Sequence, residues 1–267
     1  MPYADIGNDV KLYYDEYLPQ QGSIATPIVF LHGFTLDRRM WELQVEYFKD
    51  RCHLILIDAK GHGKSSAPES GYSRADRIED LLRFVEVLNL DAYHLVGLSM
   101  GGSTALGYSL LYPEKIKSLT LASTSATGYK VGPRISRIDR MVKEQGLEAA
   151  RKKWIQYAVN YYSDDQKAIK DSLRLMMTEH SGAPWMDKLR GKYPPPDNDL
   201  ERISSLNIPT KIFAGTEDKV FEPLAHILGE KIPNSNISIF EGVGHMINME
   251  EPERFNHELD EFLVRFI

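Results

Sequence analysis

Apolar segments of strand type alternate with helical segments along most of this chain. The strand-like segments are residues 27–33, 53–61, 93–99, 117–124, 210–218 and 236–245, and helical segments lie between them. Nearly continuous apolar strands that alternate with helices are typical of a parallel sheet covered by helices on both faces. Residues 2–18 differ, because two alternating strands flank "GND", which predicts a hairpin. The sequence therefore predicts an α/β fold whose mostly parallel sheet begins with an antiparallel N-terminal ribbon.

Between residues 128 and 200 the alternation stops and helical segments follow one another without strands, as in "LEAARKKWIQYAVNYY" and "DQKAIKDSLRLMMTEH". Strand and helix alternation resumes after residue 200. We therefore expect a core domain made of residues 1–127 and 201–267, with residues 128–200 inserted as a helical cap or lid. A chain of 267 residues is long enough for one large α/β domain that carries such an insertion.

The composition narrows the classes of partner. A formal net charge of −6 argues against nucleic acid or an anionic membrane surface, because both attract basic proteins. The apolar runs are far shorter than the ~20 residues that cross a bilayer. Small molecules are therefore the expected ligands, and the oligomeric state is left open between monomer and homodimer.

Two features bear on the cellular compartment. The first twenty residues do not show a basic region followed by an apolar stretch, the pattern of a secretory signal. The single cysteine, Cys52, cannot form an internal disulfide, so folding does not require an oxidising compartment. Both features favour a cytoplasmic location.

The stretch "HLVGLSMGGSTAL" places Ser99 between Gly97 and Gly101, where an apolar strand gives way to small, helix-compatible residues. A sharp turn from strand to helix is the setting of a nucleophile elbow, which exposes a serine above the edge of the sheet. The helix that follows directs backbone N–H groups toward the reacting centre. We therefore expect Ser99 to be a nucleophile.

A serine hydroxyl needs a neighbouring base to take its proton. His245 lies in a short loop after the last strand, at the edge where open α/β sheets bind ligands. The base in turn needs a carboxylate that fixes its tautomer. Asp218 follows the preceding strand; Glu217 competes with it, and the alternation of side chains favours Asp218.

An oxyanion hole requires two backbone donors near the nucleophile. The turn "HGF" after the strand at residues 27–33 would present the N–H of Phe34 opposite the N–H of Met100, which follows Ser99. His32 in the same turn is expected to be structural. The histidines and carboxylates do not fall at the spacing of a zinc site, so neither a metal nor an organic cofactor is expected.

Taken together, the chain resembles the α/β-hydrolase superfamily over nearly its whole length. The resemblance rests on "HGF" at 32–34, "DAKGHGKS" at 58–65, "GLSMGG" at 97–102, "GTED" at 215–218 and "GH" at 244–245. The chain order Ser99, Asp218, His245 is also the order of that superfamily. Within it, the sequence is similar to small capped carboxylesterases and lactonases, including relatives of the oxoadipate enol-lactonases. The resemblance implies Ser99 as nucleophile, His245 as base and acid, Asp218 as orienting carboxylate, and a small ester or lactone as substrate.

Other uses of the same residues stay open. A related lyase of menaquinone biosynthesis tends to carry an arginine just after the double glycine, where this chain has Ser103. Cofactor-free perhydrolases and haloperoxidases share the triad, and the sequence does not separate them from esterases. A hydrolase-fold protein that only binds its ligand is a further alternative, which the intact triad disfavours.

Overall fold

The computed structural model describes residues 2–19, 24–130, 134–189, 192–193 and 197–266. They form an eight-stranded sheet in the order β1-β2-β4-β3-β5-β6-β7-β8. The strands are β1 (Tyr3–Asp5), β2 (Lys11–Tyr17), β3 (Ile24–Leu31), β4 (Cys52–Ile57), β5 (Tyr93–Leu98), β6 (Ile116–Ala122), β7 (Thr210–Gly215) and β8 (Ser235–Phe240). β1 and β4 both pair antiparallel with β2, and all other neighbours are parallel. The mostly parallel sheet with an antiparallel N-terminal ribbon is confirmed.

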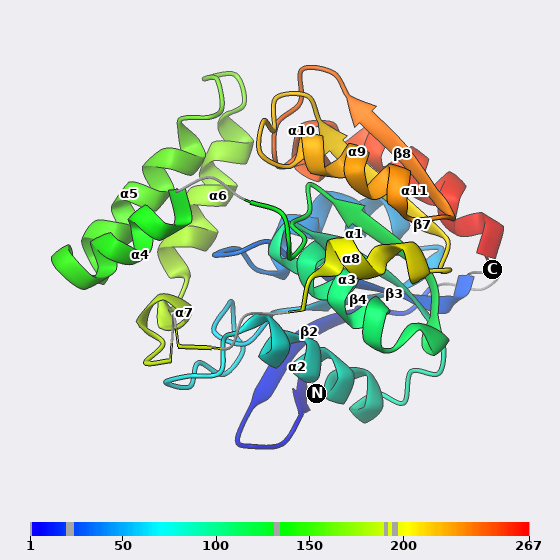
Figure 1. Ribbon diagram of the computed structural model, residues 1–267, viewed down its shortest axis with the longest axis horizontal. Coiled ribbons are helices and arrows are strands. Elements are labelled where there is room, and N and C mark those ends of the chain that lie inside the picture. The colour runs from blue at the N-terminus through cyan, green and yellow to red at the C-terminus, as the bar shows by residue number, and fades with distance from the viewer. Residues whose placement is uncertain (1, 20–23, 131–133, 190–191, 194–196, 267) are drawn as a thin grey trace.

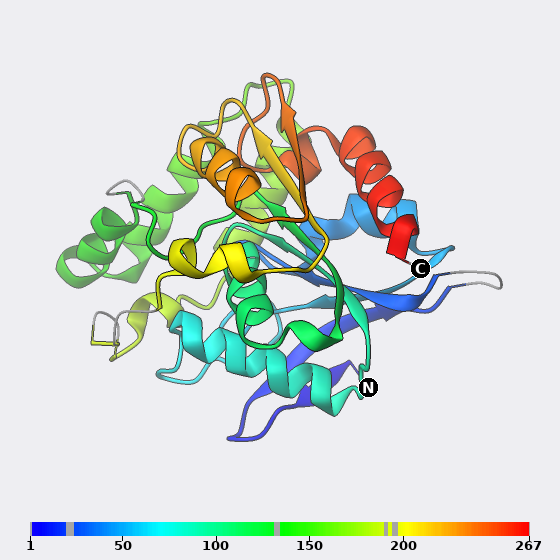
Figure 2. The same cartoon turned by 45° about the vertical axis from the view of Figure 1, so that its right-hand side comes forward.

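Helices cover both faces of this sheet (Figure 1 and Figure 2). Side chains that alternate along each strand divide the interior into two apolar clusters: in β3, Val29 belongs to one and Phe30 to the other. The first cluster packs under α2 (Arg74–Val87), α3 (Met100–Leu111) and α9 (Glu222–Lys231), and the second under α1 (Glu42–Phe48) and α11 (Pro252–Leu263).

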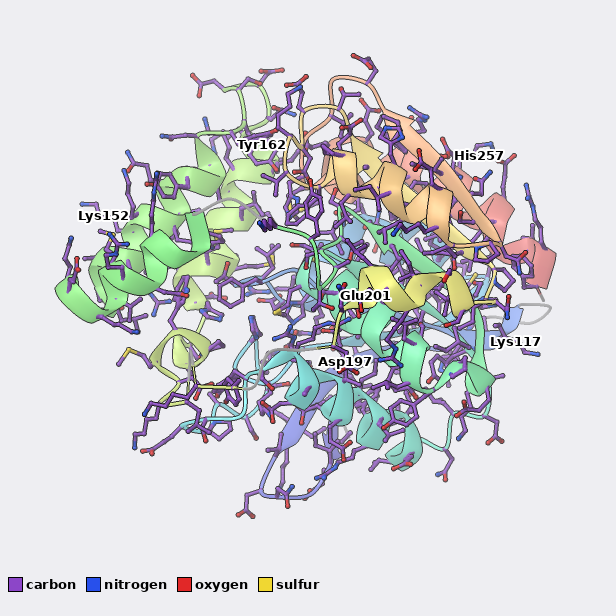
Figure 3. The ribbon with its side chains drawn as sticks, in the orientation of Figure 1. Lys117, Lys152, Tyr162, Asp197, Glu201 and His257 are labelled. Atoms are coloured by element: carbon purple, nitrogen blue, oxygen red, sulfur yellow. The ribbon has the colours of Figure 1, made fainter. Side chains whose placement is uncertain are left out.

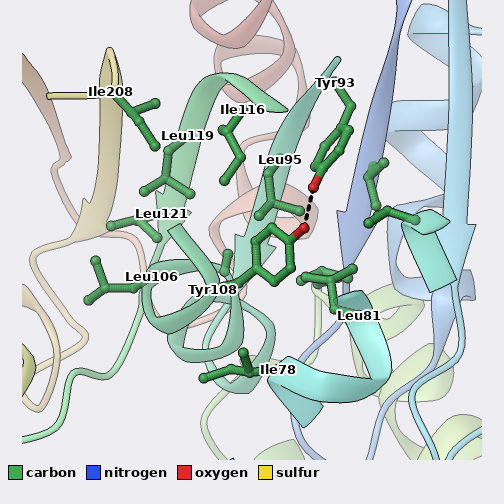
Figure 4. Packing of buried hydrophobic residues seen from close by; sticks show 14 of the residues in the cluster. Ile78, Leu81, Tyr93, Leu95, Leu106, Tyr108, Ile116, Leu119, Leu121 and Ile208 are labelled. Atoms are coloured by element: carbon green, nitrogen blue, oxygen red, sulfur yellow. Dashed lines mark hydrogen bonds between the residues drawn. The ribbon is translucent and has the colours of Figure 1, made fainter. Parts of the chain in front are cut away.

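Figure 4 shows part of the first cluster, in which Leu95, Leu119 and Leu121 of the sheet meet Ile78 of α2 and Leu106 of α3. The hydroxyl of Tyr93 donates to that of Tyr108 at 2.7 Å inside this apolar layer. The bond satisfies two buried polar groups and joins β5 to α3, the two elements that flank Ser99.

Local signals in the sequence account for where α2 begins. The hydroxyl of Ser73 accepts a hydrogen bond from the Asp76 N–H at 3.1 Å, and the carboxylate of Asp76 accepts one from the Ser73 N–H at 2.8 Å. This reciprocal capping box satisfies two N–H groups at the start of the helix and stabilises it by about 1 kcal/mol.

The chain leaves the sheet after β6 and returns to it at β7. Between them lie α4 (Arg134–Gln145), α5 (Leu147–Val159), α6 (Lys167–Glu179), α7 (Ala183–Met186) and α8 (Asp199–Arg202). We call α4 to α7 and the loops between them the helical insertion; it lies to the left of the sheet in Figure 1. The division of the chain into a core and a cap domain at residues 128 and 200 stays a prediction.

Strand order explains where a site can form. From β3 the chain moves to β4 on one side, and from β4 it crosses to β5 on the other side of β3. Such a reversal leaves a crevice at the carboxyl ends of the two central strands. Leu31 pairs with Gly97 in the register of β3 and β5, so the loop after β3 and the turn at Ser99 leave the sheet side by side.

Candidate active site

Ser99 occupies a strained turn between β5 and α3. Its backbone has φ 56° and ψ −111°, a conformation that residues with a side chain rarely adopt. The Ser99 N–H donates to the carbonyl of Ala122 at 3.0 Å, and the Ser99 carbonyl accepts from the Ser103 N–H at 2.9 Å. Bonds to β6 on one side and to α3 on the other therefore hold the residue in place.

Two glycines make this turn possible. A Cβ atom on Gly97 would lie 2.5 Å from the carbonyl carbon of Gly101, and one on Gly101 would lie 2.2 Å from the carbonyl oxygen of Leu31. Both contacts are with backbone atoms, which cannot move aside as a flexible side chain can. The close approach of α3 to the ends of β3 and β5 therefore requires glycine at both positions.

Asp218 and His245 meet at the same edge of the sheet. Nδ1 of His245 lies 2.6 Å from Oδ2 of Asp218. Because a carboxylate only accepts hydrogen bonds, Nδ1 carries the hydrogen, and Nε2 is left with a free lone pair. The Asp218 side chain is 6% exposed and that of His245 is 32% exposed. The carboxylate is therefore buried, whereas the imidazole is accessible to solvent.

The turn after β7 decides which carboxylate reaches the histidine. The Asp218 N–H donates to the carbonyl of Gly215 at 3.1 Å, and the Asp218 side chain accepts from the Phe221 N–H at 3.3 Å. Glu217 instead points outward, where its half-exposed carboxylate pairs with Lys219. Of the two acids considered from the sequence, Asp218 is the one in contact with His245.

The loop after β3 carries Phe34, the other proposed oxyanion donor. A bond of 3.2 Å from the Leu36 N–H to the Gly33 carbonyl closes its turn. Thr35, at φ 63°, donates its hydroxyl to the Phe34 carbonyl at 2.6 Å and accepts from the indole N–H of Trp154 at 2.7 Å. Met100 is the first residue of α3, so its N–H has no acceptor within that helix.

His32 supports this loop. One ring nitrogen lies 2.8 Å from the Gly33 carbonyl, and the other accepts from the Ala59 N–H at 2.9 Å. Burial is the main cause that lowers the pKa of His32, so the ring is neutral at pH 7. With both nitrogens bonded to backbone, His32 ties the loop after β3 to the loop after β4.

The "DAKGHGKS" segment provides a second support. The buried carboxylate of Asp58 accepts bonds from the Arg38 N–H at 2.8 Å and the Lys64 N–H at 2.9 Å, and it pairs with the Arg38 guanidinium at 3.0 Å. Gly63 is required beside it, because a Cβ atom there would lie 2.1 Å from Asp58 Oδ2. Asp58 thus connects this segment to the end of the Phe34 loop.

An aromatic group surrounds Phe34. The ring of Phe34 lies edge-on to four rings at centroid distances of 5.5 to 6.1 Å, those of His62, Trp154, His180 and Trp185. Burial lowers the pKa of His180 to about 3 and that of His62 well below its usual value. Both histidines are therefore neutral at pH 7, and this aromatic group is uncharged where the Phe34 loop meets the helical insertion.

Buried neutral histidines predict that acid destabilises the protein. Burial also lowers the pKa of His94 to about 4. Because the folded-state pKa values lie below the unfolded value, the unfolded chain binds more protons below pH 6.5, and stability is lost as pH falls toward the folded values. Between pH 7 and pH 5, His94 and His180 should each lower the free energy of unfolding by about 2 kcal/mol. Urea unfolding at pH 7, 6 and 5 measures the loss.

The matching variant is His180→Phe, which removes one of these buried imidazoles. It should reduce the difference in unfolding free energy between pH 7 and pH 5 by about 2 kcal/mol. An equal pH dependence in His180→Phe and wild type would show that His180 is not held neutral by the fold.

Membrane spans and metal sites are both absent from the part of the chain that the structure describes. None of the described helices is long and apolar enough to cross a membrane. Among the described residues there is also no group of three or more His, Cys, Asp or Glu side chains placed to hold a metal ion.

Comparison with known proteins finds relatives along almost the whole chain. A Bacillus subtilis (strain 168) protein with the provisional name 2-succinyl-6-hydroxy-2,4-cyclohexadiene-1-carboxylate synthase is 29% identical, covering 89% of this chain and 90% of that protein. The 3-oxoadipate enol-lactonase 2 of Acinetobacter baylyi is 29% identical, covering 97% of this chain and 95% of that protein.

Solved structures share the fold. The crystal structure of the enol-lactonase from Burkholderia xenovorans LB400 aligns with a TM-score of 0.85 at 20% identity, covering 98% of this chain and all of that one. A model of the alpha/beta hydrolase family matches residues 28–258. That match includes the segments of Phe34, Ser99, Asp218 and His245, and it places this protein in the alpha/beta hydrolase family.

Proposed function

We propose that this protein is a serine hydrolase that cleaves a small carboxylic ester or lactone through an acyl-enzyme intermediate. Ser99 is the nucleophile, His245 the base and acid, and Asp218 the carboxylate that orients His245. The N–H groups of Phe34 and Met100 form the oxyanion hole. The observation that carries the proposal is the 2.6 Å contact between His245 and Asp218, at the sheet edge where the strained turn presents Ser99.

In the first half of the reaction, Oγ of Ser99 attacks the carbonyl carbon while Nε2 of His245 takes the hydroxyl proton. The negative charge that develops on the carbonyl oxygen is bound by the two backbone N–H groups, each of which is worth about a hundredfold or more in rate. Collapse of the intermediate breaks the bond between carbonyl carbon and alkoxy oxygen. The leaving oxygen takes the proton from His245, and the acyl group remains on Ser99.

The second half repeats these steps with water. His245 removes a proton from water, which attacks the acyl carbon, and Ser99 leaves with the proton that His245 returns. With a lactone, the alcohol released in the first half stays attached to the acyl chain, so the product is a single hydroxy acid. His245 acts as base only while its imidazole is neutral.

A chromogenic ester series from acetate to octanoate tests the proposal, followed by a panel of lactones monitored by acid release. Labelling by a fluorophosphonate probe tests the nucleophile without any assumption about substrate. Hydrolysis together with labelling supports a serine hydrolase. A folded protein that neither labels nor hydrolyses any member of the two panels would instead fit a protein that only binds its ligand.

A second candidate is the reaction named for the Bacillus subtilis relative. The related lyase tends to carry an arginine just after the double glycine, where this chain has Ser103. Arg74 lies nearby, but its guanidinium donates to the Ser103 carbonyl at 3.0 Å and pairs with Asp199 at 2.7 Å. These contacts hold Arg74 within the fold, so it does not take the place of the lyase arginine. Formation of that relative's named product by the purified protein, at a rate above ester hydrolysis, would favour the synthase.

The proposal extends to the location and the partners of the protein. We propose a cytoplasmic enzyme whose partner is a small ester or lactone, and which requires neither nucleic acid nor a membrane. The acidic net charge of −6 supports this choice of partner.

A further inference from the structure

The loop that carries His245 is fixed by one carboxylate. Glu250, at the end of α10 (Ile247–Glu250), accepts a hydrogen bond from the Gly244 N–H at 2.8 Å through Oε2. Its Oε1 accepts another from the Met246 N–H at 2.9 Å. Gly244 and Met246 are the residues directly before and after His245. A single side chain therefore holds the backbone on both sides of the proposed base.

The same carboxylate reaches the helical insertion. Oε1 of Glu250 lies 3.4 Å from the hydroxyl of Tyr162, which follows α5 and is only 6% exposed. Figure 3 labels Tyr162 where the helical insertion meets the part of the core that contains α10. Because a carboxylate can only accept, the tyrosine donates this bond. The insertion thus contributes one of the three donors around Glu250.

The neighbouring tyrosine contacts the other half of the proposed pair. The hydroxyl of Tyr161 donates to the backbone carbonyl of Glu217, the residue before Asp218. The Tyr161 ring also packs on the histidine loop, since a Cβ atom on Gly244 would lie 2.3 Å from Tyr161 Cε1. Two consecutive residues of the insertion therefore touch the Asp218 turn and the His245 loop together.

We propose that Glu250 and Tyr162 are positioning residues for His245. Glu250 holds the histidine loop so that the imidazole faces Asp218, and Tyr162 makes that alignment depend on docking of the helical insertion. The inference rests on the proposed function of His245 as base. It assigns the insertion a part in ordering the base, besides any part in covering the substrate.

Partial burial is the main influence on the pKa of Glu250 and raises it above its usual value, whereas the bonds from Gly244 and Met246 and the charge of His245 act to lower it. Nδ1 of His245 contacts Asp218, and the Phe221 ring packs against the imidazole at 5.3 Å between centroids. From the insertion, the Tyr162 hydroxyl faces Glu250.

The test compares Glu250→Gln with Glu251→Gln, an exposed neighbour of the same type. Glutamine has one acceptor oxygen in place of two, so one of the two flanking N–H groups loses its partner. We expect kcat for a chromogenic ester to fall about 10- to 100-fold with little change in KM, because loss of support misplaces the base more than the substrate. Glu251→Gln should match wild type.

The split between kcat and KM separates positioning from a general loss of structure. Tyr162→Phe removes only the longest of the three bonds to Glu250, so it should lower kcat less, by about 2- to 10-fold, with KM unchanged. Glu250→Asp keeps both acceptor oxygens and should recover part of the kcat that Glu250→Gln loses. Thermal unfolding of each variant identifies any that fails to fold.

A measurement without substrate keeps the inference independent of the proposed reaction. The proton on Nδ1 of His245, which donates to Asp218 at 2.6 Å, gives an NMR resonance that reports this alignment, and its loss in His245→Gln assigns it. We expect the resonance to move or broaden in Glu250→Gln and to match wild type in Glu251→Gln. The same resonance in wild type and Glu250→Gln, or the same kcat in a hydrolytic wild type and Glu250→Gln, overturns the positioning role. If wild type neither labels nor hydrolyses, the proposed function fails, while the resonance still decides whether Glu250 positions His245.

Discussion

Replacing Ser99 by alanine is expected to reduce kcat for ester hydrolysis by about 10⁴-fold or more. In a serine protease, removal of the nucleophilic serine lowers kcat by about 10⁶-fold. Alanine keeps the Cβ atom and removes only the hydroxyl. The strained backbone at φ 56° is therefore held by the same bonds to Ala122 and Ser103, and the fold should be unchanged. Ester turnover and fluorophosphonate labelling of the purified variant measure the effect.

The matched control is Ser103→Ala, one turn further along α3. Its hydroxyl accepts from the Arg74 guanidinium at 3.1 Å, and it takes no part in the proposed reaction. We expect labelling and turnover close to wild type. If Ser99→Ala kept its activity after purification away from host esterases, the acyl-enzyme route would have to be abandoned.

Replacing Asp218 by asparagine should have the second-largest effect, a loss of about 10³- to 10⁴-fold in kcat near neutral pH. The amide has nearly the same shape as the carboxylate but can donate a hydrogen bond to Nδ1 of His245. The imidazole would then carry its hydrogen on Nε2 and could not accept the proton of Ser99. The loss of negative charge also leaves the imidazolium without its partner.

Glu217→Gln is the control for this variant because Glu217 is adjacent in sequence, is half exposed and pairs with Lys219. Its expected kcat is that of wild type. Steady-state kinetics and thermal unfolding on both variants distinguish a catalytic loss from a folding defect. An inactive Glu217→Gln beside an active Asp218→Asn would reverse the assignment of the orienting carboxylate.

The fold could be predicted from the sequence because its signals are local. Apolar strands are recognised by their composition, and α2 begins where Ser73 and Asp76 form a capping box. The position of β4 between β2 and β3 carries no such signal, because it depends on pairing between segments far apart in the chain.

The site also contains some residues that a sequence signal identifies and others that depend on contacts between distant segments. Asp218 and His245 could be expected to meet because the residues that follow adjacent parallel strands share one edge of a sheet. Glu250 was not singled out, and nothing in the sequence paired it with Tyr162, since a contact between side chains 88 positions apart has no periodic pattern. An acidic residue shortly after a Gly-His turn is the signal that could have suggested Glu250, because its carboxylate can accept from the N–H groups of the turn.

The sequence of the insertion contains a group of aromatic residues, Trp154, Tyr157, Tyr161 and Tyr162. Their near-helical spacing suits either the packing of the insertion onto the core or a substrate pocket. In the structure, Trp154 bonds to Thr35 and Tyr162 is buried against Glu250, so both join the insertion to the core. Hydrophobic spacing identifies which residues are buried, whereas their partners follow only from the packed chain.

The backbone at Ser99 implies a trade-off between stability and activity. A residue with a side chain in such a conformation costs about 1 to 3 kcal/mol, which glycine would largely avoid. The Ser99→Gly variant would therefore be the more stable protein and an inactive one. Selection for stability alone would replace this serine by glycine. The proposed role of Ser99 as nucleophile gives a reason for keeping a less stable residue at this position.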